Sequence, residues 1–253
     1  MTAALETRGL AKRFGGLVAT NDVTFTLERG ARHALIGPNG AGKTTFVNLL
    51  TGVLPPSAGQ VLLGGEDVTQ LRPEARVHRG LVRTFQINQL FADLTPLETL
   101  SLAVAERLGL GRGWARAVGG EALTHEVDAI ADRFGFGRAL DVPTDRLPYG
   151  KQRLLEIAVA FACAPQVLLL DEPAAGVPEA ERRDILDAIA ALPVDVSVLL
   201  IEHDMDLVFN FAKRISVLVD GALLVEGEPD AIARDPRVRA VYLGQGEQDG
   251  GDG

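Results

Sequence analysis

Cysteine is almost absent from this sequence, which has one, Cys163, among 253 residues. A single thiol excludes an internal disulfide and any metal cluster held by several cysteines, and it is typical of proteins from a reducing compartment. Cys163 lies in the apolar run LLEIAVAFACA, so we expect it to be a buried structural thiol.

Long apolar runs are also missing. The longest unbroken ones, 157–164 and 167–170, are far shorter than the roughly 20 residues that a membrane-spanning helix needs. The first residues, MTAALETRGLAKRF, lack the apolar core of a signal peptide. The sequence therefore predicts a chain that neither spans nor crosses a membrane.

The sequence has no excess of basic charge. Its 25 basic and 34 acidic residues give a net charge of −9, whereas nucleic-acid-binding proteins usually carry a basic patch. We therefore expect no nucleic-acid partner. The hydrophobic fraction of 47% indicates a globular protein, and the length suits one α/β domain.

The order of the predicted elements indicates strands on both sides of a helical insertion. Early strands are predicted at 5–10, 23–27 and 34–36, and VLLGGEDV indicates a hairpin at Gly64-Gly65. From about 72 to 160 the pattern predicts helices, with a Gly/Arg-rich mobile connection at 109–120. Strands return in VLLLDE, VSVLLIE and ISVLV, around the helix EAERRDILDAIAAL, and the tail 245–253 is expected to be disordered.

Residues 37–44, GPNGAGKT, match the phosphate-binding pattern G-x-x-x-x-G-K-[ST], with a predicted strand before and a helix after. The glycines let backbone N–H groups turn toward a β-phosphate, and the helix N-terminus adds its positive dipole end. Lys43 is positioned for the β- and γ-phosphates, and the Thr44 hydroxyl for Mg²⁺. The motif predicts nucleoside triphosphate binding without saying how the energy is used.

Two acids, Asp171 and Glu172, end the buried strand VLLL, at the sheet edge where ligands of α/β folds gather. Alone they could be a solvated strand end, but beside Lys43 they suit Mg²⁺ binding and water activation respectively. His203 follows another apolar strand and is placed to reach the γ-phosphate, although a lone histidine is usually structural. Gln86, in RTFQ, has no signature of its own and would otherwise be a surface residue.

The order of these pieces resembles the ABC ATPase family over about residues 5–244: GPNGAGKTT, FQ, LPYGKQRLLEIA, VLLLDEP and a histidine after a strand. The resemblance implies a P-loop α/β fold, with a mixed sheet core, an N-terminal antiparallel β subdomain and a helical subdomain at about 87–162 inserted in the core, all in one domain, 1–244. It also implies ATP and Mg²⁺ as ligands.

The resemblance further assigns roles to single residues. Glu172 resembles the catalytic base, His203 the switch histidine and Gln86 a glutamine that senses Mg²⁺ and nucleotide, so that the metal set is Thr44, Gln86 and Asp171. Phe14 resembles the aromatic residue that stacks on adenine, and Ala175-Gly176-Val177 the segment that couples two ATPases. The full set implied to contact nucleotide is Phe14, Val18, Asn39, Gly40, Ala41, Gly42, Lys43, Thr44 and Thr45.

The chain departs from the family in the signature segment, where L-S-G-G-Q is replaced by LPYGKQ. In the family this segment binds the γ-phosphate of ATP held by the opposing subunit, so that Tyr149, Gly150 and Lys151 are implied to act in trans. Pro148 replaces the usual serine and has neither a hydroxyl nor an N–H. We therefore hypothesise a pair of different ATPases with unequal sites, in which hydrolysis is intact at the site containing Glu172.

LPYGKQRLLEIA, DEPAAGV, LLIEHDMDLVF, RTFQINQLFADLTPLETL and PRVRAVYLG more particularly resemble ATPase subunits of branched-chain or hydrophobic amino-acid importers. The implied partners are a second ATPase, two transmembrane permease subunits, for which region 72–160 supplies a groove, and a periplasmic or lipid-anchored binding protein. The implied location is the cytoplasmic face of the inner membrane. Alternatives are a urea or amide importer, an exporter ATPase, or a soluble ABC ATPase without a transport role.

Overall fold

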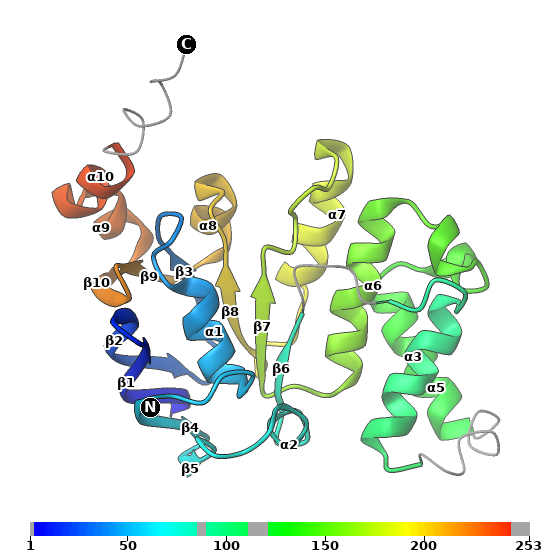
Figure 1. Cartoon of the computed structure of the whole chain (residues 1–253). Coiled ribbons are helices and arrows are strands. Elements are labelled where there is room, and N and C mark those ends of the chain that lie inside the picture. Colours follow the sequence, from blue (N-terminus) through cyan, green and yellow to red (C-terminus); the bar gives the residue numbers. More distant parts are fainter. Residues whose placement is uncertain (1–2, 85–89, 111–120, 244–253) are drawn as a thin grey trace. The chain divides into compact units, whose positions relative to one another are not determined.

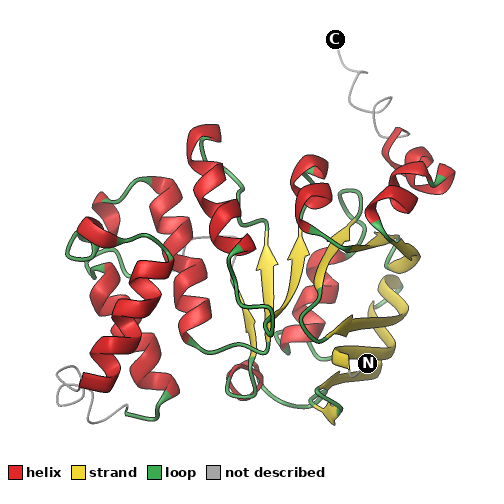
Figure 2. Cartoon of the chain, turned by 180° about the vertical axis from the view of Figure 1, so that it is seen from behind, coloured by secondary structure: helices red, strands yellow, loops and turns green. Residues whose placement is uncertain are grey.

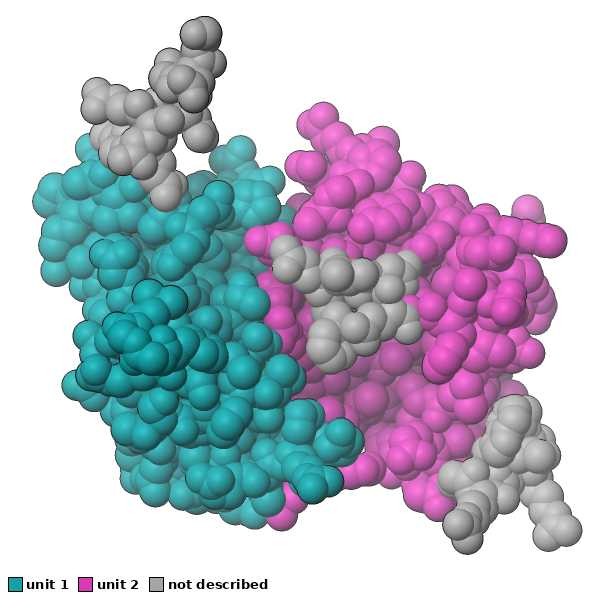
Figure 3. Space-filling model, viewed as in Figure 1, with its two compact units in different colours: residues 1–76, 197–253 teal, residues 77–196 magenta. Residues whose placement is uncertain are grey.

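The structure is a computed structural model that describes residues 3–84, 90–110 and 121–243. The chain forms two compact units, one of residues 1–76 and 197–253 and the other of residues 77–196 (Figure 3). These bounds differ from the helical insertion expected at 87–162, because the second unit also contains two strands and the helix that follows them. The assignment of one domain over 1–244 stays a prediction.

The first unit contains an antiparallel sheet in the order β2-β1-β4-β5. Its strands are β1 (Ala3–Phe14), β2 (Leu17–Glu28), β4 (Ala58–Leu63) and β5 (Glu66–Asp67). The strands predicted at 5–10 and 23–27 are the middle parts of β1 and β2. The predicted hairpin at Gly64 and Gly65 is confirmed, and both residues have positive φ (58° and 91°), as a tight two-residue turn requires.

The same unit contains four strands in the order β10-β9-β3-β8. These are β3 (Arg32–Ile36), β8 (Ser197–Ile201), β9 (Arg214–Val219) and β10 (Ala222–Gly227), of which β8 and β9 run parallel to β3 and β10 runs antiparallel to β9. Strands β3 and β8 are almost wholly buried, which explains the apolar runs at 34–36 and 198–201. The helices are α1 (Lys43–Thr51), α2 (Pro73–Val77), which ends at the unit boundary, α8 (Met205–Phe211), α9 (Pro229–Arg234) and α10 (Pro236–Leu243).

The second unit combines a parallel strand pair with a group of helices (Figures 1 and 2). The strands are β6 (Leu81–Arg83) and β7 (Val167–Asp171), and the helices are α3 (Pro96–Arg107), α5 (Glu121–Arg133), α6 (Tyr149–Ala162) and α7 (Glu179–Ala190), with single 3₁₀ turns at Gly137–Ala139 and Thr144–Arg146. Helices α3, α5 and α6 pack against one another. The expectation of helices alone from 72 to 160 was wrong at β6, which is too short to show a strand period but pairs with β7.

Helix α3 begins where its sequence predicts. Thr95 accepts a hydrogen bond from the backbone of Glu98, and the Glu98 side chain accepts one from the backbone of Thr95. This reciprocal cap satisfies two N–H groups that a helix start otherwise leaves without partners. The cap explains why the helix starts directly at Pro96.

No helix within the described residues has the length and hydropathy needed to cross a membrane. The connection expected at 109–120 and the tail expected at 245–253 fall largely or wholly outside the described residues.

Candidate functional site

Two glycines shape the loop between β3 and α1 because neighbouring backbone leaves no room for a side chain. A Cβ on Gly37 would lie 2.2 Å from the Leu218 carbonyl oxygen, and one on Gly42 would lie 2.5 Å from the Ala19 oxygen. Gly42 also has a φ of 96°, which other residues rarely adopt. The loop is therefore held between β2 and the end of β9, and both outer glycines are required by space, Gly42 by conformation as well.

The start of α1 is suited to an anion. Its first residues are Lys43, Thr44 and Thr45, and the helix has no side-chain cap because Gly42 precedes it. Backbone N–H groups at such an end lack helical partners and carry the positive end of the helix dipole. The Lys43 ammonium donates to the carbonyl oxygens of Gly37 (2.6 Å) and Pro38 (3.0 Å), which holds its charge at the loop.

The remaining predicted phosphate-loop residues differ in exposure. Asn39, Gly40 and Thr44 are exposed, whereas Ala41 is buried and its N–H donates to the Pro38 carbonyl at 3.2 Å. Polar groups of the loop therefore face solvent, and Ala41 anchors it.

An exposed aromatic ring lies at the end of β1. Phe14 is 47% exposed, and the Lys12 ammonium lies 5.1 Å from its ring centre. Val18 is the second residue of the return strand β2 and precedes Ala19, the residue whose carbonyl lies against Gly42. The hairpin thus carries an accessible aromatic ring on β1, next to β2, the strand that borders the phosphate loop.

His203 leaves the sheet at the same edge as the phosphate loop. Leu35 pairs in parallel with Ile201, and the loop and the histidine each begin two residues later. The His203 side chain is 65% exposed, and its backbone N–H donates to the buried Glu202 carboxylate at 3.0 Å. Asp204 then caps α8, so the histidine is fixed between a strand end and a helix start.

In the second unit, Asp171 ends β7 and is paired with Arg83, the last residue of β6. The Arg83 Nη2 lies 2.6 Å from Asp171 Oδ2, and both side chains are more than nine-tenths buried. The Asp171 N–H also donates to the Thr84 hydroxyl at 3.4 Å. Sequence reasoning missed Arg83; the only signal was a charged residue ending a short apolar strand.

Glu172 has a backbone conformation that is unusual for its residue type. Its φ is 46°, in the left-handed region, and its carbonyl accepts a hydrogen bond from the Ala175 N–H at 3.1 Å. Such a conformation costs on the order of 1–3 kcal/mol and is found most often at functional positions. The turn directs the chain away from the strand immediately after the two acids.

The signature segment forms the start of α6. Tyr149 is 40% exposed, and the Gly150 N–H donates to the Glu181 carboxylate of α7 at 2.8 Å. The Lys151 ammonium lies 4.0 Å from the Asp184 carboxylate, also on α7. Sequence reasoning missed both acids, which are more than thirty residues further along the chain.

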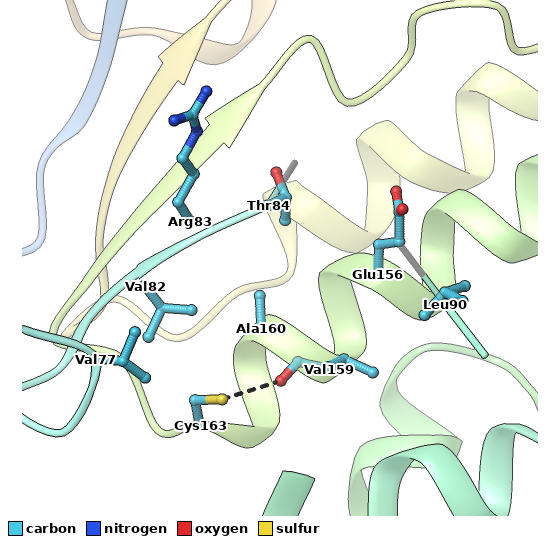
Figure 4. A pocket seen from close by; sticks show the side chains of 9 residues that line it. All are labelled: Val77, Val82, Arg83, Thr84, Leu90, Glu156, Val159, Ala160 and Cys163. Atoms are coloured by element: carbon cyan, nitrogen blue, oxygen red, sulfur yellow. Dashed lines mark hydrogen bonds between the residues drawn. The ribbon is translucent and has the colours of Figure 1, made fainter. Parts of the chain in front are cut away.

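A cavity of about 250 Å³ lies between β6 and α6 in the second unit (Figure 4). Its walls are mostly apolar, and they include Val82, Leu90 and Val159. Cys163 lines this cavity and is only half-buried, rather than fully buried as expected, and its thiol contacts the Val159 carbonyl at 3.5 Å. Burial raises the pKa of this thiol, which disfavours the reactive thiolate, although Arg107 opposes the shift.

The C-terminal helix supports the strand that leads into the phosphate loop. Tyr242 of α10 packs on the apolar cluster that contains Ala34 and Ile36. Burial raises the pKa of Tyr242 to about 12, and the Gly37 backbone opposes this shift. The PRVRAVYLG segment is thus helical over Pro236–Leu243, and its Tyr242 packs behind the strand that leads into the loop.

The structure therefore gathers the predicted residues in two groups. The first unit holds Phe14, Val18, the phosphate loop and His203, and the second holds Asp171, Glu172 and the start of α6. Gln86 lies outside the described residues. Arg83, the last residue of β6, and Asp171, the last residue of β7, lie at the same end of this parallel pair.

Comparison with known families gives two matches. The family described as ABC transporter matches residues 20–175, and the family described as branched-chain amino acid ATP-binding cassette transporter matches residues 222–248. The second match includes α9 and α10.

Curated relatives match along nearly the whole chain. The high-affinity branched-chain amino acid transport ATP-binding protein BraF of Pseudomonas aeruginosa is 40% identical over 250 residues, which cover 95% of this chain and 98% of that protein. The protein of the same description named LivG in Escherichia coli K12 is 39% identical with the same coverage. The probable LivG of Archaeoglobus fulgidus is 35% identical over 247 residues, which cover 95% of each chain.

Solved structures of ATP-binding cassettes have a similar fold. A cassette of an ABC transporter in its ADP conformation has a TM-score of 0.83 at 29% identity and covers 96% of this chain and 100% of its own. A nucleotide-free ATP-binding cassette has a TM-score of 0.82 at 29% identity and covers 96% and 99%. The P-loop α/β fold expected from the sequence is therefore confirmed.

Proposed function

Because the chain belongs to the ABC transporter ATP-binding family, we propose that it is the ATP-hydrolysing subunit of an importer for branched-chain or related amino acids. The substrate class is supported by the curated relatives, whose descriptions name branched-chain amino acid transport, and by the C-terminal match at 222–248. The single observation that carries the ATPase assignment is the loop at residues 37–44, with Lys43 held at its carbonyls and an uncapped helix start.

ATP binds to the first unit, where different groups suit its phosphates and its adenine. The N–H groups at the start of α1 and the Lys43 ammonium bind the phosphates. The exposed ring of Phe14 stacks on the adenine, and Val18 contacts it from the adjoining strand.

The donor groups also fit Mg²⁺, which prefers oxygen ligands. The Thr44 hydroxyl is exposed at the loop, and the Asp171 carboxylate ends a buried strand. Gln86 completes the set by its resemblance to the family. When bound, Mg²⁺ neutralises charge on the phosphates. Arg83 donates to one oxygen of Asp171, which orients the carboxylate.

Hydrolysis is assigned to Glu172 and His203. Glu172 accepts a proton from the attacking water, and its strained turn directly follows the end of β7. His203 donates to the γ-phosphate, on which negative charge accumulates. The His203 side chain is largely exposed and lies at the sheet edge that carries the phosphate loop, and both features support this role.

The chain works as one member of a pair of ATPases, in which the start of α6 completes the partner's ATP site. Tyr149, Gly150 and Lys151 form the part offered to the partner, and Pro148 makes that part unusual. Two permease subunits hold the pair at the cytoplasmic face of the membrane, and a binding protein delivers the substrate. The cavity in Figure 4 lies largely within region 72–160, which by its resemblance to the family would supply the groove for the permease.

The first experiment measures ATP hydrolysis by the complex purified with its co-encoded subunits. Glu172→Gln is expected to lower turnover by roughly 10²-fold or more, because a general base contributes about that factor. Glu179→Gln is the matched control, since it removes the same charge from an exposed position seven residues away. Equal turnover in the two variants would show that Glu172 is not the base.

The second experiment tests the substrate class. The complex is reconstituted in proteoliposomes with the encoded binding protein, and ATP-dependent uptake of labelled leucine, isoleucine and valine is measured. Uptake should require ATP and fail in the Glu172→Gln complex. Strong uptake of urea or short amides, with none of leucine, would place the system in a different importer class.

A further inference from the structure

Helix α6 starts without the usual side-chain cap. Pro148 precedes it and offers neither a hydroxyl nor an N–H, and the first turn contains no acidic residue. The N–H groups of a helix start need partners from elsewhere. The Gly150 N–H finds one in the Glu181 carboxylate, which comes from α7. An anion supplied by the chain itself therefore occupies this helix end.

Glu181 lies so close that it determines which residue can stand at position 150. A Cβ on Gly150 would lie 2.3 Å from Glu181 Oε2 and 2.8 Å from Glu181 Cβ. The carboxylate thus covers the backbone of Gly150 directly. Any molecule that approaches this N–H must first move the Glu181 side chain.

A second acid is engaged in the same way one turn further along α7. The Asp184 carboxylate lies 4.0 Å from the Lys151 ammonium. Glu181 and Asp184 are three positions apart on α7, so their side chains share one face of that helix. The start of α6 and these two acids line a cavity of about 210 Å³. Both groups that would attract a phosphate, the Gly150 N–H and the Lys151 ammonium, therefore face carboxylates of α7.

We propose that Glu181 is a placeholder anion that regulates access to the half-site offered to the partner: it occupies the Gly150 N–H until the terminal phosphate of the partner's ATP displaces it. This inference rests on the proposed function, in which the start of α6 meets that phosphate. A carboxylate and a phosphate compete for the same donor and repel each other at close range. Glu181 therefore raises the ATP concentration at which the pair closes, and Asp184 acts in the same direction through Lys151.

The test compares Glu181→Gln with Glu179→Gln in the complex with its co-encoded partner ATPase and permeases. Both variants remove one acid from the first turn of α7, so both lose the same favourable interaction with its helix dipole. Only Glu181 touches Gly150. A glutamine keeps the shape and can still accept from the N–H, but it no longer repels phosphate.

The expected result is a fall of roughly tenfold or more in the ATP concentration for half-maximal turnover in Glu181→Gln, since a hydrogen bond to a charged group shifts an equilibrium by about that factor. The kcat should stay close to that of the control. If Glu181 only capped the helix, its variant would melt at a lower temperature, but its ATP requirement would equal or exceed that of Glu179→Gln. That outcome overturns the proposal.

The same variants are titrated with a non-hydrolysable ATP analogue, so that the result does not depend on turnover. Tighter analogue binding in Glu181→Gln than in Glu179→Gln supports the placeholder, and equal or weaker binding refutes it. Absence of ATP hydrolysis in the unmodified complex would instead contradict the proposed function. The two failures are therefore separate.

Discussion

Arg76 connects the end of α1 to the segment before α2, and its replacement tests how far the stability of the first unit depends on these contacts. Its side chain is 1% exposed, although arginine is rarely buried. The guanidinium donates to four carbonyl oxygens, two at the end of α1 and two in the segment before α2: Leu49 (2.9 Å), Leu50 (2.5 Å), Thr69 (2.8 Å) and Leu71 (3.1 Å). Helix ends leave such carbonyls without partners, so Arg76 acts as the C-terminal cap of the helix that bears Lys43.

The magnitude follows from the contacts. Four hydrogen bonds from a charged donor contribute about 6 kcal/mol at the low end of the usual range. Burial lowers the pKa of Arg76 to about 10, with the nearby Asp67 opposing the shift. Burial of the guanidinium also costs free energy that a neutral replacement would not incur, and we take this cost to offset about half of the hydrogen-bond contribution. Arg76→Met should therefore lower the free energy of unfolding by about 3 kcal/mol.

Thermal unfolding followed by circular dichroism measures this loss. For a chain of this length, 3 kcal/mol corresponds to a fall of roughly 6–12 °C in Tm. The Tm of Arg76→Lys should lie between those of the unmodified protein and Arg76→Met, because one ammonium cannot reach all four carbonyls. Arg72→Met is the control, since it removes the same charge from an exposed side chain. A Tm for Arg76→Met within about 2 °C of this control would refute the reasoning, because surface substitutions alone have effects of that size.

Two further predictions concern His33 and Gly42. Burial lowers the pKa of His33 to about 4 despite the opposing charge of Glu226, so only the unfolded chain binds this proton between pH 6.5 and 4. The free energy of unfolding should therefore keep its full value above pH 6.5 and fall by about 3 kcal/mol as the pH is lowered to 4. Urea unfolding of His33→Asn should lack that part of the loss. Gly42→Ala should weaken ATP binding at least tenfold in equilibrium titration, since its Cβ meets the Ala19 oxygen at 2.5 Å. Gly65→Ala is the control, because its φ of 91° is equally unfavourable but nothing lies within 4 Å, and equal ATP affinities would contradict the steric argument.

The strand, loop and helix around residues 37–44 are predictable because every signal is local. The apolar run, the glycines and the helical period lie within about twenty residues, and the structure places them as expected, with Gly42 directly before α1. The same holds for β7, whose four apolar residues lead to Asp171. Local propensity and tertiary environment agree at these positions, which is why the fold could be inferred from the sequence.

The residues that support the site could not be inferred in this way. Nothing near Arg76 in the sequence indicates burial, because its partners are carbonyl groups that every residue has. Arg83 and Asp171 are 88 residues apart and meet only because β6 and β7 are parallel neighbours. The three residues of β6 are too few to show a period, so the strand and its arginine both required the tertiary structure.

Pro148 is visible in the sequence, but its consequence depends on a contact that is not. The sequence alone shows a lost hydroxyl, which predicts an unusual half-site for the partner. The structure adds that the remaining donor, the Gly150 N–H, is intact and occupied by Glu181, a residue 31 positions away. A lost group cannot be restored by nucleotide, whereas an occupied donor can be released when a stronger anion arrives. For the proposed pair of ATPases, we therefore expect the inequality between the two ATP sites to vary with ATP concentration, and to shrink when the charge of Glu181 is removed.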